Sequence, residues 1–246
     1  EIAAGGVYQV NACYELTNQL TQTNQSLSGL FSQLIAKNPA PYAQYLHLPD
    51  LEIASASPER LVSRRGQAIT TSPIKGTIRS DEQIFGAKDK AENLMIVDLM
   101  RNDFGRICES GSVKVTELFR TEKHPGLRHL VSDVTGTLTG QMKWSQIFEA
   151  LAPAGSISGA PKSAALRIIN THEQVLRGPY CGAIGWVQGD RAEIAVGIST
   201  FWRTNDDVLH FGTGAGITWA SDAGAEWDET RLKVNHLLSI AGGEIL

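Results

Sequence analysis

The sequence predicts an α+β protein with largely antiparallel sheets. Runs rich in β-branched and aromatic residues, bounded by turn residues, predict strands at 7–16, 51–57, 59–64, 67–74, 112–119, 129–138, 183–189, 192–202 and 208–217. Apolar residues spaced three and four apart predict helices at about 24–37, 81–104, 144–151, 159–170 and 222–241. Several strands follow one another across short turns, which favours antiparallel neighbours over a doubly wound parallel sheet.

The first strand separates two kinds of side chain onto opposite faces. Tyr8 and Val10 alternate with Gln9 and Asn11. Because successive side chains in a strand point to opposite faces, the two amides point together. Both a solvated outer face and a binding face are compatible with this pattern.

The helix expected at 81–104 carries a carboxylate on its apolar face. Glu92, Met95, Ile96 and Leu99 fall at positions i, i+3, i+4 and i+7. Burying this carboxylate without a partner would cost several kcal/mol, so a cation, a metal ion or protonation should neutralise it. The alternative is a glutamate near the helix end that reaches solvent.

The last predicted helix begins after a capping residue, either Ser221 or Asp222. Glu226 and Glu229 are three residues apart near its first turn, where acidic residues complement the helix dipole. Together with Glu92 they would also suit a hard, oxygen-preferring cation, of which Mg²⁺ is the first choice.

Three further segments are candidates for ligand contact. Residues 151–170 pass from a small-residue turn into a helix, and residues 212–217 form a glycine-rich run after a strand, so both could present backbone N–H groups to an anion. Lys75 lies between Pro73 and Gly76 on what we expect to be a stiff turn. It is either a surface residue or a desolvated lysine whose neutral amine is a nucleophile.

Composition indicates an ordinary globular protein, which we expect to form one domain over residues 1–246. The chain is 42% hydrophobic and 20% charged, with a net charge of −4 and no long run of one sign, which argues against nucleic-acid or membrane partners. Cys13, Cys108 and Cys181 are widely spaced, as expected of free thiols in a reducing cytosol, and no apolar run of about 18 residues is present. We therefore expect a cytoplasmic protein. The chain begins at Glu1 without an initiator Met, so we expect an upstream segment.

The motifs, taken in order, resemble those of the chorismate-utilising family. The matching stretches include VYQVN, ASPERL, SPIKGTIRS, ENLMIVDLMRNDFGRI, HLVSDVTG, PAGSISGAPK, RGPYCGAIGW, GTGAGI and EWDETRLKVNHLL, and they span nearly the whole chain. The family includes anthranilate synthase component I, aminodeoxychorismate synthase component I, isochorismate synthase and salicylate synthase. The resemblance implies a four-layer αββα sandwich with the site in a cleft between the sheet ends and the covering helices.

The resemblance assigns roles to the acidic residues. Glu92 and Glu229, with Glu226 beside them, match the residues that hold Mg²⁺, which in turn holds the ring carboxylate of chorismate. Glu59 of the S-P-E motif matches the general acid for loss of the C4 hydroxyl. Its pKa should therefore be raised, so that the carboxyl keeps a proton near neutral pH.

Lys75 distinguishes the members of this family. Aminodeoxychorismate synthases read P-I-K-G-T, as this chain does, where anthranilate and isochorismate synthases usually read P-I-A-G. By resemblance Lys75 attacks C2 while the C4 hydroxyl leaves, and ammonia then enters at C4 and expels the lysine. Gln9 stands where isochorismate and salicylate synthases carry a lysine that activates water, which argues against both hydroxylating relatives.

The expected activity is thus Mg²⁺-dependent amination of chorismate to 4-amino-4-deoxychorismate, on the route to p-aminobenzoate and folate. The alternatives are anthranilate synthase component I and a non-catalytic chorismate-binding relative. Nothing in the sequence resembles a glutaminase, so ammonia should come from a glutamine amidotransferase subunit, a fused domain or solution. The remaining substrate-contacting positions implied by resemblance are His129 and Ser156 near the ring, Tyr180 near the enolpyruvyl group, and the backbone of Gly214, Ala215 and Gly216 near a carboxylate.

Two of these positions call for comment. His129 taken alone would more often be a hydrogen-bonded interior histidine. Where the family usually carries an arginine for the enolpyruvyl carboxylate, this chain has Ser199, which cannot form a bidentate cationic contact. Arg203 is four residues further on, about 13 Å along a strand, so direct replacement is not expected.

Overall fold

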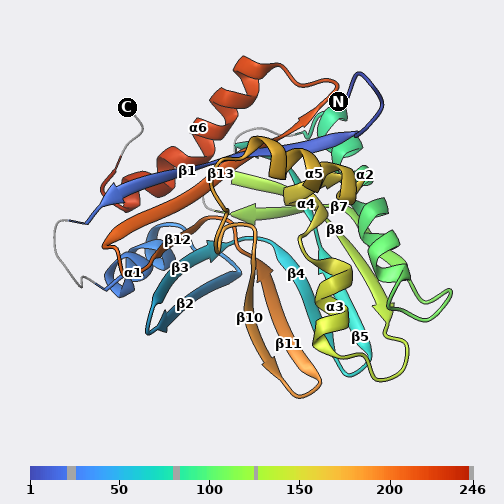
Figure 1. Cartoon of the computed structure of the whole chain (residues 1–246). Coiled ribbons are helices and arrows are strands. Elements are labelled where there is room, and N and C mark those ends of the chain that lie inside the picture. Colours follow the sequence, from blue (N-terminus) through green and yellow to red (C-terminus); the bar gives the residue numbers. More distant parts are fainter. Residues whose placement is uncertain (21–25, 80–83, 125–126, 244–246) are drawn as a thin grey trace.

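Two antiparallel sheets form the centre of the protein (Figure 1). The computed structural model describes residues 1–20, 26–79, 84–124 and 127–243. Six strands form one sheet in the order β2 (Tyr42–Leu48), β3 (Leu51–Ser57), β12 (Thr200–Arg203), β13 (Val208–Thr218), β1 (Gln9–Gln19) and β9 (Gly159–Ala160). The other sheet has the order β10 (Ala183–Gln188), β11 (Arg191–Val196), β4 (Arg60–Arg65), β5 (Ala68–Ser72), β8 (Leu127–Thr137) and β6 (Ile74–Arg79), with β7 (Lys114–His124) also paired with β8.

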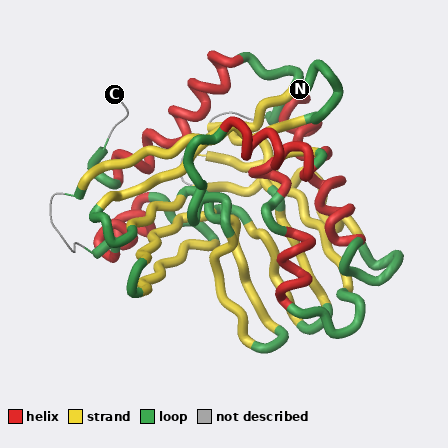
Figure 2. The backbone as a smooth tube through the Cα atoms, viewed as in Figure 1, coloured by secondary structure: helices red, strands yellow, loops and turns green. Residues whose placement is uncertain are grey.

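Helices cover the outer faces of the two sheets (Figure 2). The described helices are α1 (Ser28–Lys37), α2 (Ala87–Gly105), α3 (Trp144–Leu151), α4 (Gly155–Ser158), α5 (Lys162–His172) and α6 (Ala223–Ile240). α1 and α6 pack against the six-stranded sheet, α2 packs against β6, β7 and β8 of the other sheet, and α3 contacts α2. The predicted α+β class and four-layer αββα sandwich are confirmed.

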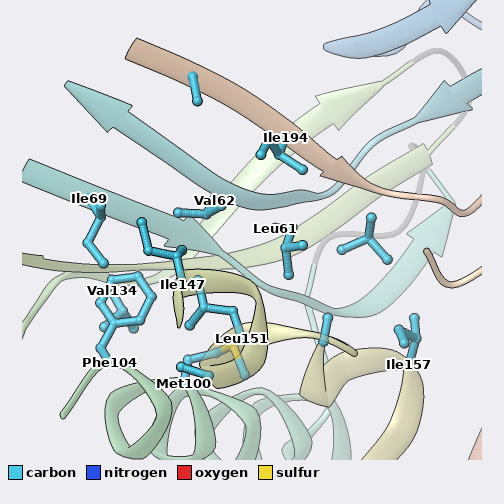
Figure 3. Packing of buried hydrophobic residues seen from close by; sticks show 14 of the residues in the cluster. Leu61, Val62, Ile69, Met100, Phe104, Val134, Ile147, Leu151, Ile157 and Ile194 are labelled. Atoms are coloured by element: carbon cyan, nitrogen blue, oxygen red, sulfur yellow. The ribbon is translucent and has the colours of Figure 1, made fainter. Parts of the chain in front are cut away.

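Separate apolar clusters hold the helices to the sheets. In the larger cluster, Met100 and Phe104 of α2 lie beside Ile147 and Leu151 of α3 and face the strands (Figure 3). Each of these side chains is at most 2% exposed, and full burial of one contributes about 1.5–3 kcal/mol. The second cluster joins the six-stranded sheet to α1 and α6 and contains Leu27, Leu34, Ala54, Ala56, Phe201, Phe211, Val234, Leu237 and Ile240.

The face of the first strand that carries Gln9 and Asn11 is buried. Gln9 is fully buried and Asn11 is 6% exposed, whereas Tyr8 is 70% exposed. The amides therefore face the interior, and the interpretation of this face as a solvated outer face is wrong. Buried amides require partners or a ligand, which makes this face of β1 a candidate binding surface.

Several element predictions differ from the structure. The helix expected at 159–170 begins as strand β9 and becomes helix α5 only at Lys162, and the strand expected at 67–74 is divided between β5 and β6. The helix expected at 81–104 starts at Ala87, and the parts of the expected helices at 24–25 and 81–83 lie outside the described residues.

Strand β2 was not expected, because its side chains are only partly buried and show no clear alternation. The single strand expected at 192–202 is divided between β11 in one sheet and β12 in the other, and Ser199 at the crossing has a φ of 51°. Lys75 belongs to strand β6 rather than to a turn. Its neighbour Gly76 has a φ of 85° and packs against Asp89 of α2, which only glycine tolerates easily.

All three cysteines are free thiols, as predicted. Within the described residues, no helix is both long and apolar enough to cross a membrane.

Candidate functional site

A pocket of about 500 Å³ opens between the sheets and α6. It is lined by residues from the β3–β4 connection, β6, β8, α4, β13 and α6. Seven predicted site residues line this one pocket: Glu59, Lys75, His129, Ser156, Tyr180, Gly214 and Gly216. The structure therefore brings together side chains that lie up to 157 residues apart in the sequence.

Lys75 lines the pocket, and its amine lies next to β1 and β13. A Cβ atom at Gly216 would lie 2.8 Å from Gln9 Nε2, 3.0 Å from Asn11 Oδ1 and 3.1 Å from Lys75 Nζ. Because real Cβ atoms keep a greater distance, a side chain at position 216 would force at least one of these three polar groups to shift, and glycine leaves room for them. Gln9, predicted to contact substrate, is thus adjacent to Lys75 although it does not itself line the pocket.

Lys75 and Glu59 have pKa values shifted toward each other. Burial raises the pKa of Glu59 to about 7, an effect that Ser156 and Lys75 partly offset. Burial also lowers the pKa of Lys75, and the charge of Glu92 opposes this. The shifts favour a protonated carboxyl on Glu59 near neutral pH and make the neutral amine of Lys75 easier to form, which are the forms that a general acid and a nucleophile require. The predicted rise in the pKa of Glu59 is confirmed.

Several buried polar atoms near the pocket have no hydrogen-bond partner among the described residues. They include Gln9 Oε1, Ser156 Oγ and Glu92 Oε1, which belong to three predicted site residues. Buried polar groups in folded proteins are nearly always bonded, and the exceptions point to a missing ligand, ion or water. Gln9 Oε1 and Glu92 Oε1 are therefore candidates to bind a ligand, an ion or water, whereas the Ser156 hydroxyl also lies close enough to Glu59 to lower its pKa.

His129 and Tyr180 are both held in an uncharged form. His129 Nδ1 lies 3.0 Å from the Thr77 hydroxyl, and burial with the nearby His124 lowers the pKa of His129 to about 4. Tyr180 packs its ring against Gly212, and burial raises the pKa of its hydroxyl well above the usual value. Both residues can form neutral hydrogen bonds in the pocket at physiological pH. His129 is therefore a hydrogen-bonded interior histidine, which was the interpretation of this residue taken alone, and it also lines the pocket.

The three glutamates predicted to bind a metal ion are divided into two groups. Glu226 accepts hydrogen bonds from Lys88 at 2.7 Å and Ser221 at 2.6 Å, and Lys88 Nζ is 3.8 Å from Glu92 Oε1. Burial raises the pKa of Glu92, whereas in Glu226 the bonds from Lys88 and Ser221 outweigh the effect of burial and lower it. Glu229 is 47% exposed and paired with a lysine of its own helix.

These carboxylates fit Mg²⁺ in their chemistry but do not form a preassembled cage. Among the described residues, no group of three or more acidic, histidine or cysteine side chains is close enough to hold a metal ion. Glu92 Oε1 is nevertheless buried without a hydrogen bond, and carboxylate oxygens are the ligands that Mg²⁺ prefers. Lys88 is 44% exposed and can turn to solvent if a cation takes its position. Metal binding by Glu92, Glu226 and Glu229 stays a prediction.

The position of the missing arginine opens onto the pocket. Ser199 lines it, but Arg203 is held by Glu52 at 2.7 Å and does not. The expectation that Arg203 does not replace the arginine is confirmed. The lysines that line the pocket within the described chain are Lys75 and Lys233.

Among the charged and titratable residues that line the pocket, sequence reasoning missed Lys233, His124 and His236. Lys233 of α6 is 2.6 Å from Glu229, and its i, i+4 spacing from a predicted ligand was a usable signal. His124 also lines the pocket, and no local pattern indicates this. Conversely, Ala215 was predicted to contact substrate, but it is not among the lining residues, because it lies between Gly214 and Gly216 on the opposite face of β13.

The chain resembles known proteins over nearly its full length. It is 39% identical over 247 residues to aminodeoxychorismate synthase component 1 of Escherichia coli strain K12, covering 96% of this chain and 54% of the relative. It is also 39% identical over 217 residues to anthranilate synthase component 1 of Saccharolobus solfataricus, covering 83% and 51%. The crystal structure of anthranilate synthase component I from Streptococcus pneumoniae superposes with a TM-score of 0.84 at 32% identity, covering 97% of this chain and 54% of that one.

These relatives share the fold described above, and the chain spans about half of their length. The sequence pattern of the family described as chorismate binding enzyme matches residues 1–239, which include every residue of the pocket. The match therefore covers both the sandwich and the site, and the chain belongs to the chorismate binding enzyme family.

Proposed function

We propose that this chain is the chorismate-binding part of an aminodeoxychorismate synthase, which replaces the C4 hydroxyl of chorismate with an amino group. The observation that carries the proposal is Lys75, which lines the pocket beside Gln9 and Asn11 and whose charge acts on Glu59. No lysine is needed there for binding alone, because Lys233 already supplies a positive charge to the pocket.

The first step uses Lys75 and Glu59 together. The neutral amine of Lys75 attacks C2, the C4–O bond breaks, and the proton of Glu59 leaves with the hydroxyl as water. The lysine nitrogen is then bound to the ring as a secondary ammonium. The lowered pKa of Lys75 supports a nucleophilic amine, and the raised pKa of Glu59 supports an acid that still holds its proton.

The second step introduces nitrogen. Ammonia attacks C4, the ring double bond shifts, and the bond from C2 to Lys75 breaks, which returns the lysine as a neutral amine. Two displacements place the amino group para to the ring carboxylate. A single attack of ammonia at C2 would give the ortho product of anthranilate synthase, a reaction in which Lys75 would have no covalent role.

Mg²⁺ is part of this proposal. Glu92 and Glu229, with Glu226 beside them, would hold it, and it would supply positive charge to the ring carboxylate of chorismate. The unbonded Oε1 of Glu92 supports this assignment. Ser156 and His129 would contact the ring, Tyr180 the enolpyruvyl group and the backbone of Gly214 and Gly216 a carboxylate.

Ammonia comes, in this proposal, from a glutamine amidotransferase subunit or domain. The word "component" in the names of the relatives supports a partner chain. The reaction itself requires only ammonia, so ammonium salts should replace the partner in vitro.

The test is the identity of the product made by the protein in its natural full length. Chorismate, Mg²⁺ and ammonium are supplied with and without an aminodeoxychorismate lyase, and the aminobenzoates are separated by chromatography. We expect lyase-dependent p-aminobenzoate, which Lys75→Ala should reduce by at least about 100-fold. The matched control is Lys37→Ala on the exposed surface of α1, which should change nothing.

Other results would reject the assignment. Anthranilate formed without the lyase would identify the ortho-aminating reaction. Undiminished p-aminobenzoate from Lys75→Ala would remove the lysine from the mechanism. Binding of chorismate without turnover by the intact protein would identify a non-catalytic relative.

A further inference from the structure

A histidine–carboxylate pair lies at the end of the pocket formed by β6, β7 and β8, and the reaction above does not use it. Across these strands, Thr77 is opposite His129, and His129 is opposite Glu122. Residues that are directly opposite in antiparallel strands share a face, and His124 shares that face because it is two residues from Glu122. The ring centroids of His124 and His129 are 4.8 Å apart, and both residues line the pocket.

Glu122 orients the imidazole of His124. His124 Nε2 is 3.0 Å from Glu122 Oε1, and the other carboxylate oxygen accepts a hydrogen bond from Arg120 at 2.7 Å. The bond with His124 and the neighbouring Arg120 lower the pKa of Glu122 to about 2, so it is ionised and can only accept. In neutral His124 the hydrogen is therefore on Nε2, and Nδ1 carries a free lone pair.

The two histidines have different chemical capacities. His129 is bonded to Thr77 through Nδ1, and its pKa of about 4 makes it a poor proton acceptor at neutral pH. His124 is bonded through Nε2 to the carboxylate of Glu122, which leaves Nδ1 as the nitrogen that can accept a proton. This is the arrangement of a general base that a third group orients.

We infer that His124, positioned by Glu122, is the base that converts ammonium to ammonia at the pocket. The inference rests on the proposed function, which consumes neutral ammonia. In this step one N–H bond of ammonium breaks, its electron pair stays on nitrogen, and the proton moves to Nδ1. The first step of the reaction leaves Glu59 without its proton, so the proton released here balances the cycle.

Other charged or titratable groups lie near this pair. They are Arg120 on β7, the neutral His129 on β8, and Lys233 and His236 of α6, which line the same pocket. The charge of Lys233 acts on His129. Glu122 is the carboxylate in direct contact with His124. Removing it should weaken His124 as a base without removing the imidazole.

The experiment compares His124→Gln with the wild-type protein in its natural full length. Glutamine can still bond to Glu122 but cannot take a proton. The matched control is His47→Gln, because His47 also pairs with a glutamate, at 3.3 Å, but is 62% exposed on β2 and outside the pocket. The rate of amination of chorismate is measured against pH at constant total ammonium, and the adduct of Lys75 formed without ammonia is followed by intact-protein mass spectrometry.

We expect His124→Gln to lose at least about tenfold in amination rate near neutral pH, at the low end for a general base. The loss should shrink to about twofold or less at alkaline pH, where most of the nitrogen is free ammonia. Formation of the Lys75 adduct should match wild type, and Glu122→Gln should show the same pH dependence with a smaller loss. His47→Gln should behave as wild type throughout.

An unchanged rate in His124→Gln, or a loss that is equal at every pH, would overturn the inference. A wild-type protein that makes anthranilate would reject the proposed function instead, and the pH dependence of the His124→Gln rate would still test the base, because that product also consumes ammonia. A wild-type protein that aminates nothing would reject both.

Discussion

The buried carboxyl of Glu59 should make the protein less stable as pH rises, and Glu59→Gln should remove this effect. Glu59 is 4% exposed and lies beside Ser156 and Lys75 in the pocket. Glutamine has nearly the same shape but carries no charge at any pH. The substitution therefore separates the cost of ionising this carboxyl from the cost of losing its contacts.

The magnitude follows from the pKa values. Burial raises the pKa of Glu59 from 4.5 to about 7, and one pKa unit corresponds to about 1.4 kcal/mol, so the full effect is roughly 3 kcal/mol. Between these two pH values the folded protein keeps a proton that the unfolded chain has released. The free energy of unfolding must therefore fall as pH rises through this window and stay low above it.

Urea unfolding at several pH values measures this directly. Glu59→Gln should differ little from wild type near pH 4.5 and should be more stable by about 1–3 kcal/mol above pH 7. Its activity should fall by about 100-fold or more, because the general acid is lost. Glu149→Gln, on the exposed face of α3, is the control and should follow wild type. A stability difference between Glu59→Gln and wild type that does not change with pH would refute the reasoning.

Three other substitutions test separate features. Gly216→Ala introduces a Cβ 3.1 Å from Lys75 Nζ and 2.8 Å from Gln9 Nε2. It should lower kcat by about tenfold or more while changing the free energy of unfolding by less than about 2 kcal/mol. A normal kcat would show that these groups need not meet. Ser199→Arg places a cation that can form a bidentate contact at the pocket wall. The KM for chorismate should then fall about fivefold or more. An unchanged KM would mean that another group already binds the carboxylate. Burial raises the pKa of Glu52, but hydrogen bonds from Tyr45, Ser26 and Arg203 outweigh this effect and lower the pKa to about 2. Glu52→Gln should therefore lower the free energy of unfolding in urea by about 3 kcal/mol at neutral pH. This cost should diminish as pH falls from about 4.5 toward 2, and a constant cost would contradict the assignment to charge.

Local patterns predicted helices α3 and α6 well, whereas α4 was not expected and the start of the helix expected at 159–170 is strand β9. α3 has the expected bounds, α6 begins after Asp222, whose side chain caps Ala225 N at 3.0 Å, and Glu92 lies on the buried side of α2. Helical spacing and capping depend on residues within four positions of each other. The sequence is therefore sufficient to predict them.

The pairing of strands could not be predicted as well from the sequence. The edge strand Tyr42–Leu48 has little alternation, because its side chains are only partly buried. The segment 192–202 is continuous in composition but changes sheets at residues 197–199. Lys75 belongs to β6 because its strand pairs with β8, about fifty residues away. Pairing between distant segments leaves no local periodicity.

Sequence alone determined the family resemblance, the α+β class and the kinds of chemical group available, because these depend on the order and identity of residues. Tertiary structure decided which of those groups meet. It placed Lys75 and Glu59 in one pocket, and it paired Glu229 with Lys233 while Glu92 and Glu226 share Lys88. It also set the register that brings His124 to the pocket. The protonation states that matter to the reaction follow from enclosure, since removing water from around a carboxyl or an amine favours its uncharged form.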